Sequence, residues 1–246
     1  MELFDSWWFT VMGMVLLAAF ARGVSGFGFS VVFAPLAILI IDPKSAIPLN
    51  LLLAQLSNVL ILLIYFRKVN TRRVLSLCVG SVLGVPVGIF VILIISSSLL
   101  KILLGTVTVL SAFLLAFKVT PTPRFTNERL AGGAAGFLCG MLTTSIGIGG
   151  PPVLLFMHTQ KWSKEEIYSA LSAFFFVNTG ASIIGLALSG LITSPILLIT
   201  ASLAPVLVVG VILGMWAFKY LNEGYFRTLS ILLIITVGFL ALLSGL

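Results

Sequence analysis

The sequence predicts an all-α polytopic membrane protein made of two inverted repeats, each a glycine-broken helix hairpin followed by three transmembrane helices. The prediction rests on composition, on the division into apolar blocks and on a duplicated glycine-rich break. The chain has 246 residues, of which 60% are hydrophobic and 9% are charged, with a mean hydropathy of +1.24. Soluble domains are about 25% charged. This composition excludes a soluble enzyme, a nucleic-acid-binding domain and a disordered chain, and leaves an integral membrane protein.

Charged and turn residues divide the chain into eight apolar blocks, and most of them have the roughly 20 residues that one membrane crossing needs. Glycine-rich segments interrupt the first block at 23–28 and the fifth block at 143–152. The arms of the first block, 7–22 and 29–41, would be roughly 20–24 Å long, a little short for a full span. The blocks are 7–41, 45–66, 74–95, 99–117, 130–157, 167–191, 195–218 and 226–246.

The two breaks belong to an internal repeat. Gly26-Phe27-Gly28 matches Gly147-Ile148-Gly149 at an offset of 121, and Asn58 matches Asn178 at an offset of 120. The polar stretch 118–129 lies at the midpoint. The chain therefore divides into a first membrane repeat, 1–120, and a second, 121–246, which together form one membrane domain. Repeats of this kind are typical of transporter folds.

The distribution of basic residues favours an inverted arrangement of the two repeats. If each broken block crossed the membrane once, seven Lys and Arg would lie in the cytoplasm and six outside. If each broken block returns to the side it entered from, eleven lie in the cytoplasm and two outside. The second distribution obeys the positive-inside rule and places both termini outside. Whether the broken blocks are re-entrant hairpins or pairs of short crossings stays open.

Each break precedes the start of a helix, and helix N-termini from both halves would meet inside the protein. Free N–H groups and the positive end of the helix dipole bind anions, and transporters place such sites between repeats. The alternative is that the glycines only permit close helix packing. The predicted substrate-binding residues are Arg22, Ser25, Gly26, Gly28, Ser30, Asn58, Thr144, Ser145, Gly147, Gly149, Gly150 and Asn178.

The polar members of this set each have a structural alternative. Arg22 could pair with an anionic substrate or extend its head to the cytoplasmic interface. Asn58 and Asn178 could bind substrate or bond across helices. Thr143, Thr144 and Ser145 offer hydroxyls beside the second break, or they could cap freed backbone. The seven acidic residues all fall in loops or near block ends, so the membrane interior suits an anion better than a cation.

Two other functions compete with a carrier. An anion channel could use the same scaffold. The pattern G-x-S-G at 23–26 is also found around the nucleophile of rhomboid-type intramembrane proteases, with His158 as a conceivable base. No P-loop motif occurs, so we expect no ATPase activity, and we expect no catalytic residues, no cofactor, no metal and no nucleic-acid partner. Coupling to a proton or ion gradient and a homo-oligomeric assembly both stay open.

The segments 21–39 (ARGVSGFGFSVVFAPLAIL), 42–52 (DPKSAIPLNLL) and 132–158 (GGAAGFLCGMLTTSIGIGGPPVLLFMH) resemble the TauE/SafE family of sulfite-exporter-like permeases. The resemblance extends over essentially the whole chain, although GFGFS differs from the GIGGG form of some members. It implies a multi-pass permease of the inner membrane that moves small sulfur-containing anions such as sulfite, sulfoacetate or related organosulfonates. It carries over no catalytic residue.

Overall fold

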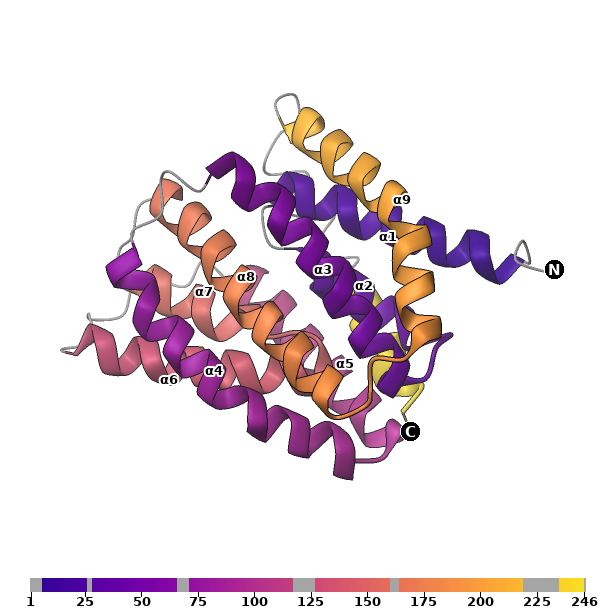
Figure 1. Ribbon diagram of the computed structural model, residues 1–246, viewed down its shortest axis with the longest axis horizontal. Coiled ribbons are helices and arrows are strands. Elements are labelled where there is room, and N and C mark those ends of the chain that lie inside the picture. The colour runs from indigo at the N-terminus through magenta and orange to yellow at the C-terminus, as the bar shows by residue number, and fades with distance from the viewer. Residues whose placement is uncertain are drawn as a thin grey trace.

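The computed structural model of the chain describes residues 6–25, 28–65, 71–116, 127–159, 164–218 and 235–245, and this part contains helices and no strands. Figure 1 shows the helices as a bundle in which α1 and α6 lie across the more steeply inclined α3, α4 and α8. The helices are α1 (Ser6–Ser25), α2 (Phe29–Ala37), α3 (Pro43–Tyr65), α4 (Thr71–Ile94), α5 (Ser97–Ala116), α6 (Glu128–Ile146), α7 (Gly150–Thr159), α8 (Lys164–Leu188) and α9 (Ser194–Phe218), with a further helical segment at 235–243.

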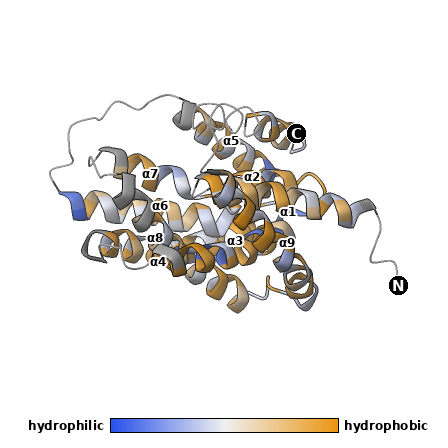
Figure 2. Cartoon of the chain, turned by 90° about the horizontal axis from the view of Figure 1, so that it is seen from above, coloured by the Kyte–Doolittle hydropathy of each residue, from blue (hydrophilic) through white to orange (hydrophobic). Residues whose placement is uncertain are grey.

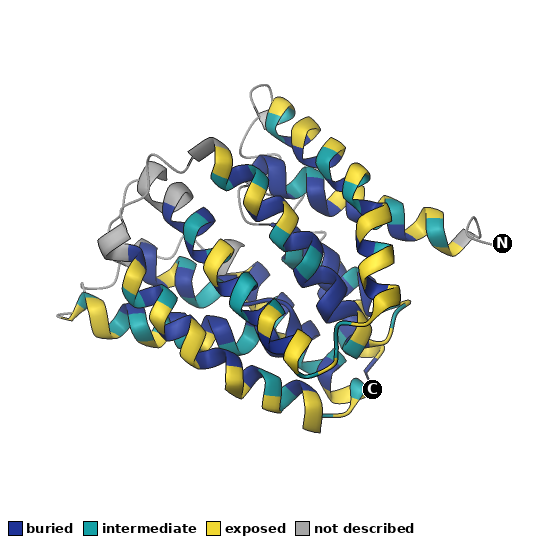
Figure 3. Ribbon diagram, viewed as in Figure 1, coloured by how far each residue is buried: buried dark blue, intermediate teal, exposed yellow. Residues whose placement is uncertain are grey.

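These helices follow the predicted apolar blocks, and the all-helical fold class is confirmed. Five of the described helices, α1, α3, α4, α8 and α9, are long and apolar enough to cross a membrane. Apolar residues cover most of the bundle in Figure 2, and Figure 3 shows exposed positions along the outer sides of α4 and α9. Large apolar side chains such as Leu83 and Leu198 occupy these positions. Lipid is the solvent that suits such a surface.

The prediction of two arms of similar, rather short length in the first broken block is wrong. α1 has 20 residues and α2 has 9, which corresponds to about 30 Å and about 14 Å. α6 and α7 repeat this pattern with 19 and 10 residues. α1 extends three residues beyond the predicted end at Arg22, because Gly23 packs directly against the backbone of α9. Each broken block is thus one long helix followed by a half-length helix.

Local chemistry explains where the short helices begin. Gly147 ends α6 in the left-handed conformation, with φ of 78°, which glycine adopts without a steric penalty. α7 then starts at Gly150, with Pro151 and Pro152 in its first turn. Proline is favoured there because the first helical N–H groups have no partner within the helix. Gly28 is the N-cap of α2, which places Ser30 in its first turn.

Two pairs of long helices pack closely and in the same direction. Along α1 and α9, Leu16 lies near Gly210 and Gly23 lies near Gly214. Along α4 and α6, backbone contacts advance in the same way, from Leu77 with Gly136 to Ser81 with Gly140. Small residues allow backbones to approach in membrane bundles. α3 and α8 meet between these pairs, and a buried apolar core runs through residues of both halves.

A polar connection also links two turns of the first half. The carboxylate of Asp42 accepts hydrogen bonds from the Ser97 hydroxyl at 2.7 Å and from the Lys44 backbone N–H at 3.0 Å. The Lys44 ammonium in turn donates to the Leu93 carbonyl at 3.3 Å. The turn after α2 is therefore held against the turn between α4 and α5, which restrains the far end of the short helix.

Candidate functional site

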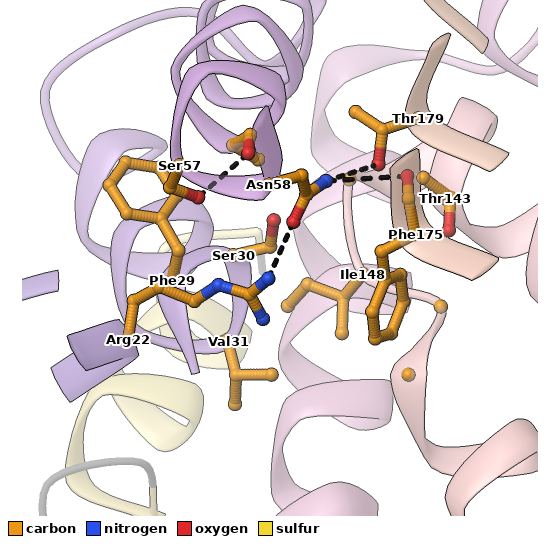
Figure 4. A pocket seen from close by; sticks show the side chains of 14 residues that line it. Arg22, Phe29, Ser30, Val31, Ser57, Asn58, Thr143, Ile148, Phe175 and Thr179 are labelled. Atoms are coloured by element: carbon orange, nitrogen blue, oxygen red, sulfur yellow. Dashed lines mark hydrogen bonds between the residues drawn. The ribbon is translucent and has the colours of Figure 1, made fainter. Parts of the chain in front are cut away.

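A small cavity of about 30 Å³ lies where the two breaks meet at the crossing of α3 and α8 (Figure 4). A cavity of this volume has room for roughly two water molecules. The first turn of α2, the segment between α6 and α7, and the middle of α3 and α8 form its wall. The lining residues are Arg22, Phe29, Ser30, Val31, Ala54, Ser57, Asn58, Thr143, Gly147, Ile148, Gly149, Gly150, Phe175 and Thr179.

Arg22 is the only formally charged residue among these lining residues. Its side chain is 2% exposed, so it does not extend to the surface, and the predicted alternative of an interfacial arginine is wrong. Its guanidinium donates to Asn58 Oδ1 at 2.7 Å. Asn58 is a neutral amide, so this bond orients the guanidinium without cancelling its charge. A guanidinium stays protonated in proteins, and the cavity wall therefore carries a buried positive charge.

Asn58 connects the guanidinium to the second half of the chain. Its Nδ2 donates to the Phe175 carbonyl and to Thr179 Oγ1, both at 3.3 Å. A backbone carbonyl can only accept, so the amide nitrogen must face α8 and the amide oxygen must face Arg22. Figure 4 shows this chain of bonds running from Arg22 through Asn58 to α8. The orientation of the cation is thus fixed by a helix of the other half.

The second half contains a similar pair. Asn178 on α8 donates from Nδ2 to Thr143 Oγ1 at 2.9 Å. Thr143 lies at an offset of 121 from Arg22, just as Asn178 lies at an offset of 120 from Asn58. In each half, a residue near the end of the long helix (α1 or α6) bonds to the asparagine of the helix that follows the short one (α3 or α8). Thr143 accepts from the asparagine and lines the cavity, so its hydroxyl proton can be donated elsewhere.

The short helices add further positive potential. Phe29, Ser30 and Val31 make up the first turn of α2 and all line the cavity, and first-turn N–H groups have no partner within their own helix. α7 contributes less, because Pro151 and Pro152 lack an N–H. The donors are therefore concentrated on the Arg22 side. Among the described residues, no cluster of three His, Cys, Asp or Glu could hold a metal ion.

The structure distributes the predicted site residues in three groups. Arg22, Ser30, Asn58, Gly147, Gly149 and Gly150 line the cavity. Gly28, Thr144, Ser145 and Asn178 lie next to it or one layer behind. Thr144 Oγ1 donates to the Gly140 carbonyl at 2.8 Å, and Ser145 Oγ to the Met141 carbonyl at 2.7 Å. Gly26 and the side chains of Ser25 and His158 lie outside the described residues.

The predicted substrate-binding set omits several lining residues, above all Thr143, which was noted only as a hydroxyl beside the second break, and Thr179. Thr143 had a usable signal, its offset from Arg22, but a threonine does not resemble an arginine. Thr179 directly follows the repeat-equivalent Asn178 and faces Asn58 instead. Gly149 also has a steric role, because a Cβ there would lie 2.1 Å from Thr143 Oγ1. The glycine of the break leaves the space that the Thr143 hydroxyl occupies.

Comparison with known proteins assigns the chain to a family. The model of the family described as "Sulfite exporter TauE/SafE" matches residues 11–241. The chain belongs to the TauE/SafE family. The resemblance noted in the sequence is thereby confirmed, as are a multi-pass membrane protein and a family of transporters rather than enzymes.

A curated relative from Cupriavidus necator is named a probable sulfite/organosulfonate exporter TauE. It is 27% identical over 151 residues, which cover 60% of this chain and 59% of the relative. The chain thus spans less than two thirds of the length of that TauE/SafE protein in the comparison. No solved structure matches the chain.

Proposed function

We propose that the protein is a secondary transporter that carries a small sulfur-containing anion by alternating access at the cavity between the two breaks. The observation that carries the proposal is the buried guanidinium of Arg22, held by Asn58 beside the first turn of α2. A guanidinium is a strong hydrogen-bond donor to oxyanions, so an anion that enters the cavity can bind to it. Family membership and the name of the relative support a sulfur oxyanion as the cargo.

We also propose that residues 1–120 and 121–246 are inverted repeats. The packing supports this arrangement. Within the first pair, α1 and α9 run in the same direction, and their repeat equivalents, α6 and α4, form a second pair whose two helices also run in the same direction as each other. α1 runs from the right of Figures 1 and 2, whereas α6 starts at the far left and runs the opposite way. Equivalent helices of opposite direction are what an inverted repeat requires.

Alternating access follows from this arrangement. Asn58 and Thr179 join α3 to α8 at the centre, while glycine-lined contacts join α1 to α9 and α4 to α6. Under the proposal, one set of helices rocks against the other while the central pair keeps the anion in place. The first turn of α2 and the hydroxyls of Ser30, Thr143 and Thr179 replace the hydration shell of the anion.

The test is uptake of labelled sulfite and methanesulfonate into proteoliposomes. We expect saturable flux that is stimulated by unlabelled anion on the opposite side. Arg22→Gln should lower this flux by at least about tenfold, because Gln can still donate to Asn58 but carries no charge. Lys101→Gln removes the same charge on α5, away from the cavity lining, and should keep wild-type flux.

Two results would contradict the proposal. Equal flux in Arg22→Gln and Lys101→Gln would show that the cavity does not bind the anion. Large single-channel currents in planar bilayers would replace the carrier by an anion channel on the same scaffold. Elution of each variant as a single monodisperse species in size-exclusion chromatography confirms that the comparison concerns folded protein.

A further inference from the structure

We infer that the ring of Phe175 sets the size limit of the transported anion, because it closes the apolar side of the cavity beside the space that Gly150 leaves. The inference rests on the proposed function and names the residue that determines how large a substituent the anion can carry. Under that proposal the head group is bound by Arg22 and the first turn of α2, and the ring of Phe175 contacts the substituent.

The first step concerns the space in the cavity. Its volume of about 30 Å³ has room for roughly two water molecules. An anion with an organic substituent needs more room than this, so a side chain of the wall must move before a longer substituent can enter. The aromatic and branched apolar side chains among the described lining residues are Phe29, Val31, Ile148 and Phe175.

The second step identifies the side chain that can move. Phe29 is 1% exposed and stacks on Phe33, with ring centroids 5.5 Å apart. Val31 and Ile148 are buried in the same core cluster. Phe175 is only partly buried. Side chains in a close-packed core shift only at the cost of strain, so the Phe175 ring is the part of the apolar wall that yields most easily.

The third step concerns the space beside this ring. Gly150 is the first residue of α7 and also lines the cavity. A Cβ built on Gly150 would meet one described atom within 4 Å, the Cζ of Phe175, at 3.4 Å. The edge of the ring therefore faces a position that has no side chain. An alanine at 150 would fill that space at ordinary contact distance, without a clash, and would hold the ring in place.

The backbone of Phe175 fixes the position of this wall relative to the head group. Its carbonyl accepts from Asn58 Nδ2 at 3.3 Å, and the oxygen of the same amide accepts from the Arg22 guanidinium at 2.7 Å (Figure 4). The repeat-equivalent residue in the first half is Gln55, which donates to the Phe176 carbonyl and is not among the lining residues. The ring at this position is thus present in one half, on the side of α8.

Straight-chain alkanesulfonates provide matched probes. Methanesulfonate, ethanesulfonate and propanesulfonate have the same head group and the same charge, and each is one methylene longer than the one before. One methylene in an apolar pocket typically changes discrimination by about 10–200-fold. At subsaturating concentrations in proteoliposomes, we expect wild-type flux to fall by at least about tenfold from methanesulfonate to propanesulfonate. Flux into protein-free vesicles is subtracted from each value.

Phe175→Leu removes the ring but keeps an apolar side chain and the backbone carbonyl. It should raise the ratio of propanesulfonate to methanesulfonate flux by about tenfold or more. Phe176→Leu makes the same change at the next residue, which is 38% exposed and does not line the cavity, and should leave the ratio unchanged. Gly150→Ala should shift selectivity the opposite way and lower the ratio of ethanesulfonate to methanesulfonate flux by about tenfold.

The ratio in Phe175→Leu decides the inference, and the ratio in Gly150→Ala decides it if Phe175→Leu does not fold. An unchanged ratio with methanesulfonate flux retained would overturn this inference and leave the proposed function standing. Equal wild-type flux of methanesulfonate and propanesulfonate, or an equal rise of the ratio in Phe176→Leu, would overturn it as well. Absence of saturable flux for every anion would overturn both the inference and the proposed function.

Discussion

Gly140 tests the close packing of α4 against α6, which joins the two halves. A Cβ built on Gly140 would lie 2.0 Å from the backbone carbonyl oxygen of Ser81, whereas ordinary contact begins at 3.4 Å. In Gly140→Ala the two helices would have to separate there by about 1.4 Å. Overpacking costs about 1–3 kcal/mol, and the upper end applies because the obstacle is backbone and no flexible side chain can turn away.

The matched control is Gly13→Ala on α1, where a Cβ meets nothing within 4 Å. Both substitutions gain up to about 1 kcal/mol of helix propensity, so this gain cancels between them. We expect Gly140→Ala to be less stable than Gly13→Ala by about 3 kcal/mol. Circular dichroism during titration with SDS in mixed micelles measures the difference. Equal stability of the two variants would refute the close contact between α4 and α6.

Two further predictions concern the second break and the topology. Gly147 and Gly190 both have positive φ, 78° and 73°, so an alanine strains either position by roughly 1–2 kcal/mol. The added Cβ at Gly147 would also lie 2.8 Å from Asn50 Nδ2, so Gly147→Ala should lower anion uptake while Gly190→Ala lowers stability alone; equal uptake in both would contradict the role of the break. In a cysteine-free background, a cysteine added after Leu246 should react with an impermeant maleimide from outside, and one at 67–70 from the cytoplasm; labelling of the C-terminus from the cytoplasm alone would rule out the inverted topology.

Hydropathy predicted the long helices well because the thickness of a membrane fixes the length of an apolar segment. It could not predict the ends of the helices at the breaks. Gly23 looked like part of an interruption, since glycine in a helix is unfavourable in isolation. In the structure it stays helical because its missing side chain lets α1 approach Gly214 on α9. That contact joins residues nearly two hundred positions apart, and no local pattern reveals it.

The candidate site was predictable where chemistry was unusual for its surroundings. Arg22 stood out as a charge inside an apolar block, and Asn58 as a duplicated amide, and both line the cavity. Thr143 stood out only as one of three hydroxyls beside the second break, because threonine is common in membrane helices and differs chemically from the arginine at its equivalent position. Its equivalence appears through the shared type of partner, Asn178 in one half and Asn58 in the other.

The unequal pair bears on how the proposed carrier would cycle. Under alternating access, each half takes the conformation of the other, but Arg22 and Thr143 do not exchange charge. An anion bound by the Arg22 guanidinium would also contact the first turn of α2 and the Thr143 and Thr179 hydroxyls of the other half, which line the same cavity. The loaded carrier, in which the anion joins both halves, should therefore reorient faster than the empty carrier. Stimulation of flux by anion on the opposite side then follows from the bound anion, without a separate gating residue.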